Sequence, residues 1–127
     1  MMTKILDRLY VGSSDFTEEG LDAAKITHII NVGGEEVRTN KIYYHERLSD
    51  DGDNPHWKFS TVLGRLGDVL SSDSHRVLVC CRAGISRSAF IVILWLERAG
   101  MSRDEAYAYV KERHPATQIA LDLLRSR

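Results

Sequence analysis

A thiol and a guanidinium lie close together in this chain, on either side of a short loop. Cys81 and Arg87 stand six positions apart, with a glycine-containing loop between them. An apolar run at 77–79 precedes the loop and a second one at 89–96 follows it, which predicts a strand, a tight turn and a helix. The backbone N–H groups of such a turn and the N-terminus of the helix attract anions. The sequence therefore predicts an anion pocket with a thiol at its floor.

The residues of this loop suit a two-step phosphate transfer. The helix N-terminus and the Arg87 guanidinium both favour the thiolate of Cys81, which is the nucleophilic form. Arg87 can grip two phosphate oxygens at once, and the small residues Ala83 and Gly84 let the backbone close around an anion. Ser88 can donate a hydrogen bond to the sulfur, and we also expect it to cap the helix that follows. Attack by Cys81 on phosphorus would give a phosphocysteine that water then hydrolyses.

Such a reaction also needs a general acid to protonate the departing oxygen and a base to activate water. The polar loop at 48–55 supplies three candidates, which are Asp50, Asp51 and Asp53. The chemistry of the residues does not choose among them.

The rest of the chain predicts the frame that positions these groups. Strands are expected from β-branched and apolar runs at 9–11, 26–32, 42–46 and 76–80. Helices are expected from apolar spacing and capping residues at 17–25, 55–70, 88–99, 102–114 and 117–125. This alternation predicts an α/β fold, with a mostly parallel central sheet of about four or five strands flanked by helices. The cysteine loop would lie at the carboxyl end of a strand, where such sheets bind ligands.

Length and composition reduce the number of possible functions further. With 127 residues, of which 43% are apolar, we expect residues 1–127 to form a single domain. The formal net charge of −1 predicts neither a nucleic-acid partner nor a membrane partner. Cys80 and Cys81 are adjacent and would point to opposite faces of a strand, so we expect no disulfide and a reducing, cytoplasmic setting. The five histidines show no metal-ligand spacing, so we expect neither a metal nor a cofactor.

The run from Cys81 to Ser88, Cys-Arg-Ala-Gly-Ile-Ser-Arg-Ser, resembles the signature of the dual-specificity protein phosphatases, within the cysteine-dependent protein tyrosine phosphatase superfamily. Segments 7–13, 26–32 and 48–50 are similar to the opening strand, the second strand and the general-acid loop of that family. The resemblance implies a protein tyrosine phosphatase-like fold and a small, stand-alone, monomeric enzyme. It would hydrolyse phosphotyrosine and phosphoserine/threonine in proteins without a metal.

The resemblance also implies a role for each site residue. Cys81 would be the nucleophile, Asp50 the general acid and base, and Ser88 an aid to the second step. The separation of 31 positions between Asp50 and Cys81 matches the family and favours Asp50 over its neighbours. Cys80 stands where the family usually has histidine, and we expect it to be a small apolar residue. The phosphate would be held by the loop residues Arg82, Ala83, Gly84, Ile85, Ser86 and Arg87.

Other functions stay open at this point. Similar loops hydrolyse phosphoinositides or RNA 5′-phosphates, but those substrates favour more cations than Arg82 and Arg87 provide. A phosphate-binding module without catalysis, as in pseudophosphatases, would generally have lost Cys81. A sulfur-transfer domain could carry a similar loop, but the Ile-Ser-Arg-Ser ending at 85–88 and the well-placed acid argue against it. A redox role for Cys80, as a partner that captures an oxidised Cys81, is suggested only by their adjacency.

Overall fold

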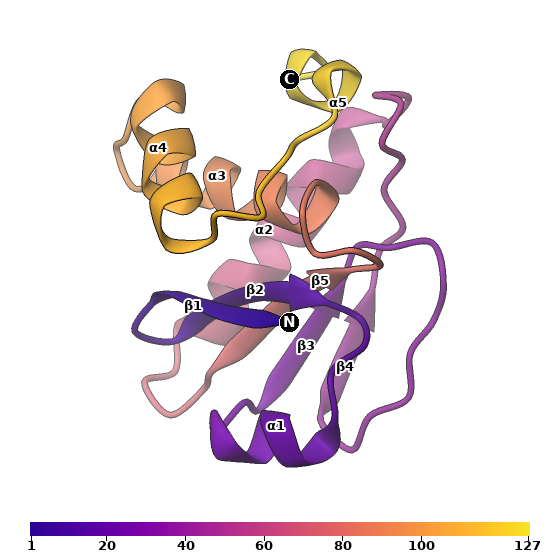
Figure 1. Ribbon diagram of the computed structural model, residues 1–127, viewed down its shortest axis with the longest axis vertical. Coiled ribbons are helices and arrows are strands. Elements are labelled where there is room, and N and C mark those ends of the chain that lie inside the picture. Colours follow the sequence, from indigo (N-terminus) through magenta and orange to yellow (C-terminus); the bar gives the residue numbers. More distant parts are fainter.

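The computed structural model describes residues 1–127 and contains one five-stranded sheet, in the order β1-β2-β5-β3-β4 (Figure 1). Strands β2, β5, β3 and β4 are parallel to one another, and only the edge strand β1 is antiparallel, against β2. This confirms the expected α/β class and the mostly parallel sheet. The strands span Met2–Leu6 (β1), Leu9–Ser13 (β2), His28–Asn31 (β3), Ile42–His45 (β4) and Val77–Cys81 (β5).

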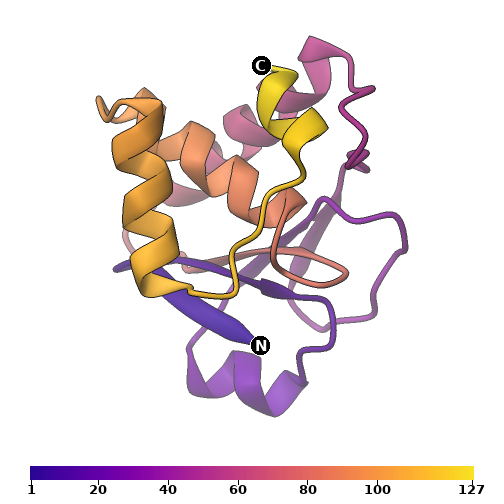
Figure 2. The same cartoon turned by 45° about the horizontal axis from the view of Figure 1, so that its top comes forward.

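Five helices cover the two faces of the sheet unequally. They span Glu18–Ala23 (α1), His56–Leu70 (α2), Arg87–Arg98 (α3), Arg103–Arg113 (α4) and Leu121–Arg125 (α5). Helices α2 to α5 gather above one face, and α1 lies alone below the other (Figures 1 and 2). The sheet is therefore sandwiched between a thick layer of helices and a thin one.

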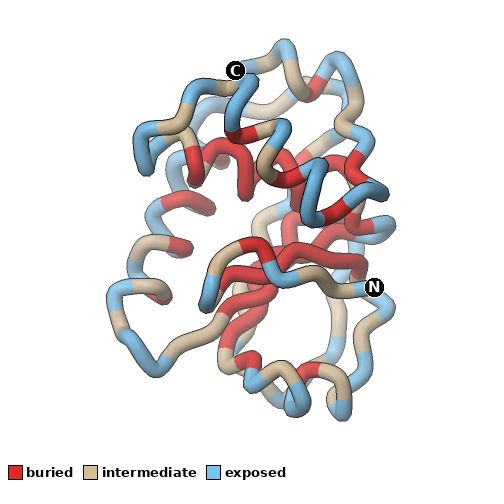
Figure 3. Tube along the Cα trace, turned by 60° about the vertical axis from the view of Figure 1, so that its left-hand side comes forward, coloured by how far each residue is buried: buried red, intermediate tan, exposed pale blue.

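Strand β5 lies in the middle of the sheet and is buried along its whole length (Figure 3). Alternate side chains of β5 enter two different cores. Val79 and Cys81 pack in the larger core with α2, α3 and α4, whereas Leu78 and Cys80 pack in the smaller core with Leu21 of α1. Cys81 therefore faces the helical layer into which the chain turns next, and Cys80 faces away from it, as the sequence predicts.

Two elements differ from expectation. Strand β1 was not expected, because only Ile5 of its five residues is buried and the segment shows no alternation of apolar and polar residues. The last helix was expected over 117–125 but begins only at Leu121. The backbone before it is extended because Gln118 and Ala120 donate their N–H groups to the cysteine loop instead of to a helical turn.

Two histidines meet at the end of the sheet opposite the cysteine loop. The rings of His28 and His75 have centroids 4.4 Å apart, and His28 is 4% exposed. Burial, together with the charge on His75, lowers the pKa of His28 below its usual value. The unfolded chain therefore binds a proton at His28 more readily than the folded chain does.

We accordingly expect the stability that His28 provides to be complete above about pH 6.5, the pKa of histidine in the unfolded chain, and to be lost as the pH falls from there through the lower pKa of His28 in the folded protein. Urea unfolding at several pH values should show a free energy of unfolding that falls by up to about 1.4 kcal/mol per pH unit for this one proton. His28→Gln should flatten this dependence, whereas the control His56→Gln, at an exposed histidine, should not. An unchanged slope in His28→Gln would contradict the assignment.

Candidate active site

The loop between β5 and α3 passes tightly over the end of β2. Cys81 is the last residue of β5 and Arg87 is the first residue of α3. Gly84 adopts a φ of +72°, and a Cβ atom at this position would lie 2.5 Å from the backbone nitrogen of Ser13. Only glycine fits here, because both the positive φ and the close approach exclude a side chain. Gly84 is thus the residue that lets the loop close.

The six backbone N–H groups of residues 82–87 donate no hydrogen bond to any other part of the protein. The last of them belongs to the first turn of α3, where the helix dipole adds partial positive charge. Unpaired backbone donors in a tight loop at a helix N-terminus form an anion-binding concavity. Residues 82–87, called the phosphate loop below, therefore have the geometry of an anion-binding site.

The side chain of Arg87 lies inside this concavity and is 17% exposed. Its Nη1 donates to the Leu48 carbonyl at 3.4 Å, and its Nε lies 3.8 Å from the Asp50 carboxylate. That Nε–H is buried and has no hydrogen-bond partner in the protein. A buried guanidinium N–H without an acceptor is costly, and an anion in the loop would supply the missing acceptor.

The sulfur of Cys81 lies at the floor of the loop, where two groups of Ser88 contact it. Ser88 Oγ is 3.2 Å from Cys81 Sγ, and the Ser88 backbone N–H donates to the same sulfur at 3.5 Å. The expected helix-capping role of Ser88 is wrong, because α3 begins one residue earlier with Ser86 at the N-cap position. Ser88 lies within the first turn, so its hydroxyl reaches the thiol instead of a backbone N–H.

The structure separates the three candidate acids. Asp50 Oδ1 accepts a hydrogen bond from Ser86 Oγ at 2.6 Å, which brings this carboxyl to the edge of the phosphate loop. Asp51 turns back on its own loop and accepts from Ser49 Oγ and from the Asp53 N–H. These hydrogen bonds lower the pKa of Asp51, so a smaller fraction of this carboxyl holds a proton near neutral pH. Neither Asp51 nor Asp53 lines the pocket that contains Cys81.

The C-terminal segment forms a wall of the pocket and also supports the acid loop. A hollow of about 540 Å³ extends from Cys81. It is lined by Asp50, Cys81, Ala83, Ile85, Ser86, Arg87, Gln118, Ile119, Ala120 and Leu121. Gly52, with a φ of +83°, lies so close to α5 that a Cβ there would be 2.5 Å from the Asp122 carbonyl oxygen. The acid loop therefore rests directly on the C-terminal helix.

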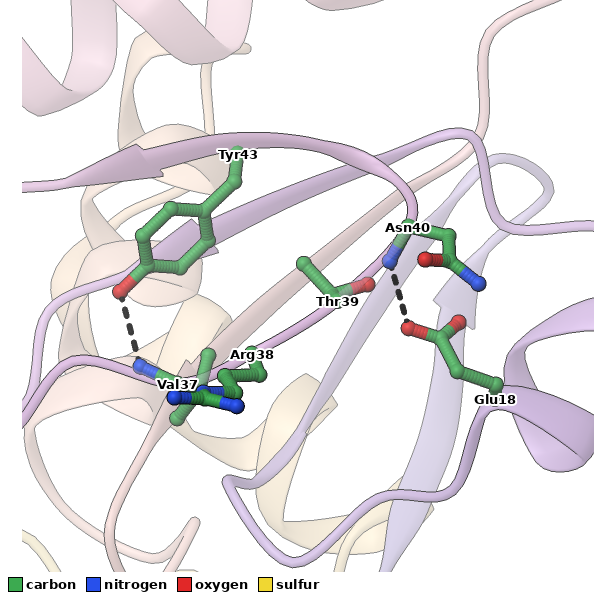
Figure 4. A pocket seen from close by; sticks show the side chains of 6 residues that line it. All are labelled: Glu18, Val37, Arg38, Thr39, Asn40 and Tyr43. Atoms are coloured by element: carbon green, nitrogen blue, oxygen red, sulfur yellow. Dashed lines mark hydrogen bonds between the residues drawn. The ribbon is translucent and has the colours of Figure 1, made fainter.

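Two further hollows lie along the segment between β3 and β4. One, of about 170 Å³, adjoins the phosphate loop and has an entirely polar lining that includes Arg82, Arg87 and Glu35. The other, of about 470 Å³, lies over Glu18, Tyr43 and residues 37–40 (Figure 4). There Glu18 accepts from the Asn40 N–H and Tyr43 accepts from the Val37 N–H. It contains no thiol and shares no residue with the pocket of Cys81.

The family model described as "Dual specificity phosphatase, catalytic domain" matches residues 9–126. This chain belongs to that family. The match confirms the resemblance seen in the Cys81–Ser88 run. It places the chain among the protein tyrosine and dual-specificity phosphatases.

Individual relatives agree with the family. Dual specificity protein phosphatase 2 of Mus musculus is 34% identical over 116 residues, covering 87% of this chain and 36% of the relative. The chain spans about a third of the length of the curated relatives it matches. Among solved structures, the human tyrosine phosphatase-like serine/threonine/tyrosine-interacting protein superposes with a TM-score of 0.86 at 27% identity, covering 98% of this chain and 91% of that one. Human DUSP28 gives a TM-score of 0.87 at 20% identity, covering 98% and 88% of the two chains, which confirms the expected protein tyrosine phosphatase-like fold.

This dual-specificity phosphatase domain carries Cys80 in front of the signature cysteine. Cys80 is fully buried in the smaller core, and this burial, together with the neighbouring Cys81, raises the pKa of Cys80 to about 12. It therefore stays a protonated thiol on the far side of β5, which disfavours the hypothesis that it captures an oxidised Cys81.

Sequence reasoning missed two parts of the dual-specificity phosphatase site. The wall at 118–121 was expected to be helical and had no role, and His114 had none either. His114 is 1% exposed and its Nε2 lies 2.7 Å from the Gly84 carbonyl oxygen. A histidine beside Pro115 at a helix end was the only signal available in the sequence. No group of three or more His, Cys, Asp or Glu side chains is placed to hold a metal ion, and none of the helices has the length and apolar character needed to cross a membrane.

Proposed function

We propose that this chain is a cysteine-dependent phosphomonoester hydrolase. It acts on phosphotyrosine and phosphoserine/threonine in proteins through a phosphocysteine intermediate. The observation that carries the proposal is the position of Cys81 Sγ at the floor of a loop with six unpaired N–H groups, with Arg87 and Asp50 at the same pocket. We take residues 1–127 as one catalytic domain that works as a monomer, and the need for a free thiolate favours a reducing, cytoplasmic setting.

In the first step, the Cys81 thiolate attacks phosphorus and the bond from phosphorus to the leaving oxygen breaks. The N–H groups of residues 82–87 and the Arg87 guanidinium bind the non-bridging oxygens, whose charge is greatest in the transition state. The proton for the leaving oxygen comes from Asp50. The Ser86 hydroxyl donates a hydrogen bond to Oδ1 of this carboxyl, so Oδ2 is the oxygen that carries the transferred proton.

In the second step, water attacks phosphorus and the phosphorus–sulfur bond breaks. The Asp50 carboxylate, now deprotonated, accepts a proton from the water. Ser88 Oγ, at 3.2 Å, donates a hydrogen bond to the sulfur as it leaves as a thiolate. Inorganic phosphate then departs, and the starting state of both groups is restored.

The pocket favours a phosphorylated side chain over the alternatives. Ile85, Ile119 and Leu121 give it apolar walls that can pack on the stem or ring of a phosphoresidue. The loop itself provides only the cations Arg82 and Arg87, fewer than a phosphoinositide or an RNA 5′-phosphate would favour. A binding module without catalysis does not need Cys81, Ser88 and Asp50 together at one pocket.

The test is phosphate release from peptides of one sequence that carry phosphotyrosine, phosphoserine or phosphothreonine, with reductant and chelator present. We expect all three to be hydrolysed, with no loss of rate as the chelator concentration rises. Binding of phosphate or vanadate without any turnover would favour the binding module. Turnover of phosphoinositides alone would move the substrate away from proteins.

A further inference from the structure

The buried histidine at the end of α4 joins the phosphate loop to the edge of the sheet. His114 Nε2 lies 2.7 Å from the Gly84 carbonyl oxygen and Nδ1 lies 2.7 Å from Thr3 Oγ1. Because a carbonyl oxygen can only accept, Nε2 must carry the hydrogen. The hydroxyl of Thr3 can then donate to Nδ1, so a neutral ring satisfies both contacts. His114 thus connects β1 to the loop while buried from solvent.

The planarity of the peptide bond turns this contact into a constraint on the anion site. In a trans peptide unit the C=O and the N–H point in opposite directions, and the chain has no cis peptide bond. When His114 holds the Gly84 carbonyl against the C-terminal segment, the N–H of Ile85 must point the other way, into the loop. The backbone N–H of Gln118 holds the Ile85 carbonyl in the same manner at 2.9 Å, which directs the Ser86 N–H inward.

Without these contacts the loop could adopt more than one backbone conformation. Gly84, at a φ of +72°, can adopt other backbone conformations at little cost, so the peptide unit after it can rotate. A rotated unit would replace an N–H donor by a carbonyl oxygen facing the anion, which repels it. The constraint therefore removes a conformation that cannot bind phosphate, and such pre-organisation increases affinity.

We propose that His114 is a positioning residue that presets the phosphate loop by holding the Gly84–Ile85 peptide unit, with residues 117–120 acting as a strap across the loop. Figures 1 and 2 show this strap running from the end of α4 to α5 beside the turn that leads into α3. The strap is fixed at its start, because Lys111 Nζ donates to the Thr117 carbonyl at 2.7 Å and Thr117 Oγ1 donates to the His114 carbonyl at 2.7 Å. The inference rests on the proposed function only in taking phosphate as the anion.

The experiment compares His114→Leu with His114→Gln. Leucine removes the donor, whereas glutamine can return an N–H to the same carbonyl. The matched control is His28→Gln, at a buried histidine on the opposite end of the sheet. The readouts are the affinity for inorganic phosphate by calorimetry, the pH midpoint of Cys81 alkylation by iodoacetamide, and the melting temperature.

We expect His114→Leu to bind phosphate about 10-fold or more weakly, since it loses a donor that orients the site. Its alkylation midpoint should move to higher pH, because the same N–H groups stabilise the thiolate. His114→Gln should recover most of both properties. His28→Gln should change neither, even where it lowers the melting temperature.

Wild-type phosphate affinity in a folded His114→Leu would overturn the proposal, as would equal losses in the leucine and glutamine variants. If His114→Leu does not fold, Thr3→Val is the second variant, since it removes only the partner of Nδ1. It should weaken phosphate binding several-fold, and wild-type affinity there would also overturn the proposal. None of the three readouts requires turnover, so a wild type that binds phosphate without hydrolysing it would contradict the proposed function and still test this inference.

Discussion

Cys81→Ser is expected to abolish hydrolysis of aryl phosphates, with kcat falling by about 10⁴-fold or more because the covalent intermediate can no longer form. A serine hydroxyl at the same position remains protonated at neutral pH and is a much weaker nucleophile than a thiolate. The phosphate loop itself should be unaffected, so the variant should still bind inorganic phosphate or vanadate. Steady-state rates and binding affinities of the same preparation check both statements.

The neighbouring cysteine provides the matched control for this prediction. Cys80 is the same type of residue one position earlier, but it faces the smaller core on the other side of β5. Cys80→Ser should keep most of the turnover while lowering the melting temperature, because it buries a hydroxyl in an apolar site. Substantial turnover by Cys81→Ser, or equal loss in both variants, would contradict the assignment of the nucleophile.

Asp50→Asn is expected to lower kcat by about 10²-fold to 10⁴-fold, the usual contribution of a general acid. The loss should grow as the leaving group becomes more basic, because a poor leaving group depends most on the donated proton. Asparagine keeps an oxygen that can accept from Ser86 Oγ at the place of Oδ1, so the loop geometry should survive. The measurement is kcat/KM against pH for a series of aryl phosphates that differ in leaving-group basicity.

Asp51→Asn and Asp53→Asn are the controls, since both residues are exposed and lie outside the pocket. Their rates and pH profiles should stay close to those of the wild type. The basic limb of the profile should disappear only in Asp50→Asn. A larger effect at Asp51 or Asp53 than at Asp50 would show that the acid loop presents a different carboxyl to the substrate.

Local sequence was enough to predict the strand, the tight turn and the helix that form the cysteine loop. Cys81, Gly84 and Arg87 lie within one turn between a strand and a helix, so their types and spacing determine which groups face the anion. The candidates at 48–55 were harder, because three aspartates within four positions have the same chemistry. The family resemblance favoured Asp50 by its separation from Cys81, and the structure distinguishes Asp50 by a hydrogen bond from Ser86, which is 36 positions away in the chain.

The parts that the sequence did not reveal depend on contacts between distant segments. The sequence at 117–120 predicts a helix. In the structure two backbone N–H groups of this segment donate to acceptors in the phosphate loop, and these contacts override the local preference. His114 is joined to Gly84 and Thr3, at separations of 30 and 111 positions. Strand β1 is an edge strand that is mostly half-buried, so it lacks the alternation that marks a strand in sequence.

The most direct test of the account is to identify the residue that carries phosphate during turnover. Wild-type protein would be mixed with an aryl phosphate, quenched in acid within milliseconds and analysed by peptide mass spectrometry. We predict one added phosphoryl group on Cys81, in a fraction of the protein that increases when Ser88→Ala slows the second step. Turnover without a phosphorylated Cys81, or a phosphoryl group on Cys80 or elsewhere, would contradict the central claim that Cys81 is the nucleophile.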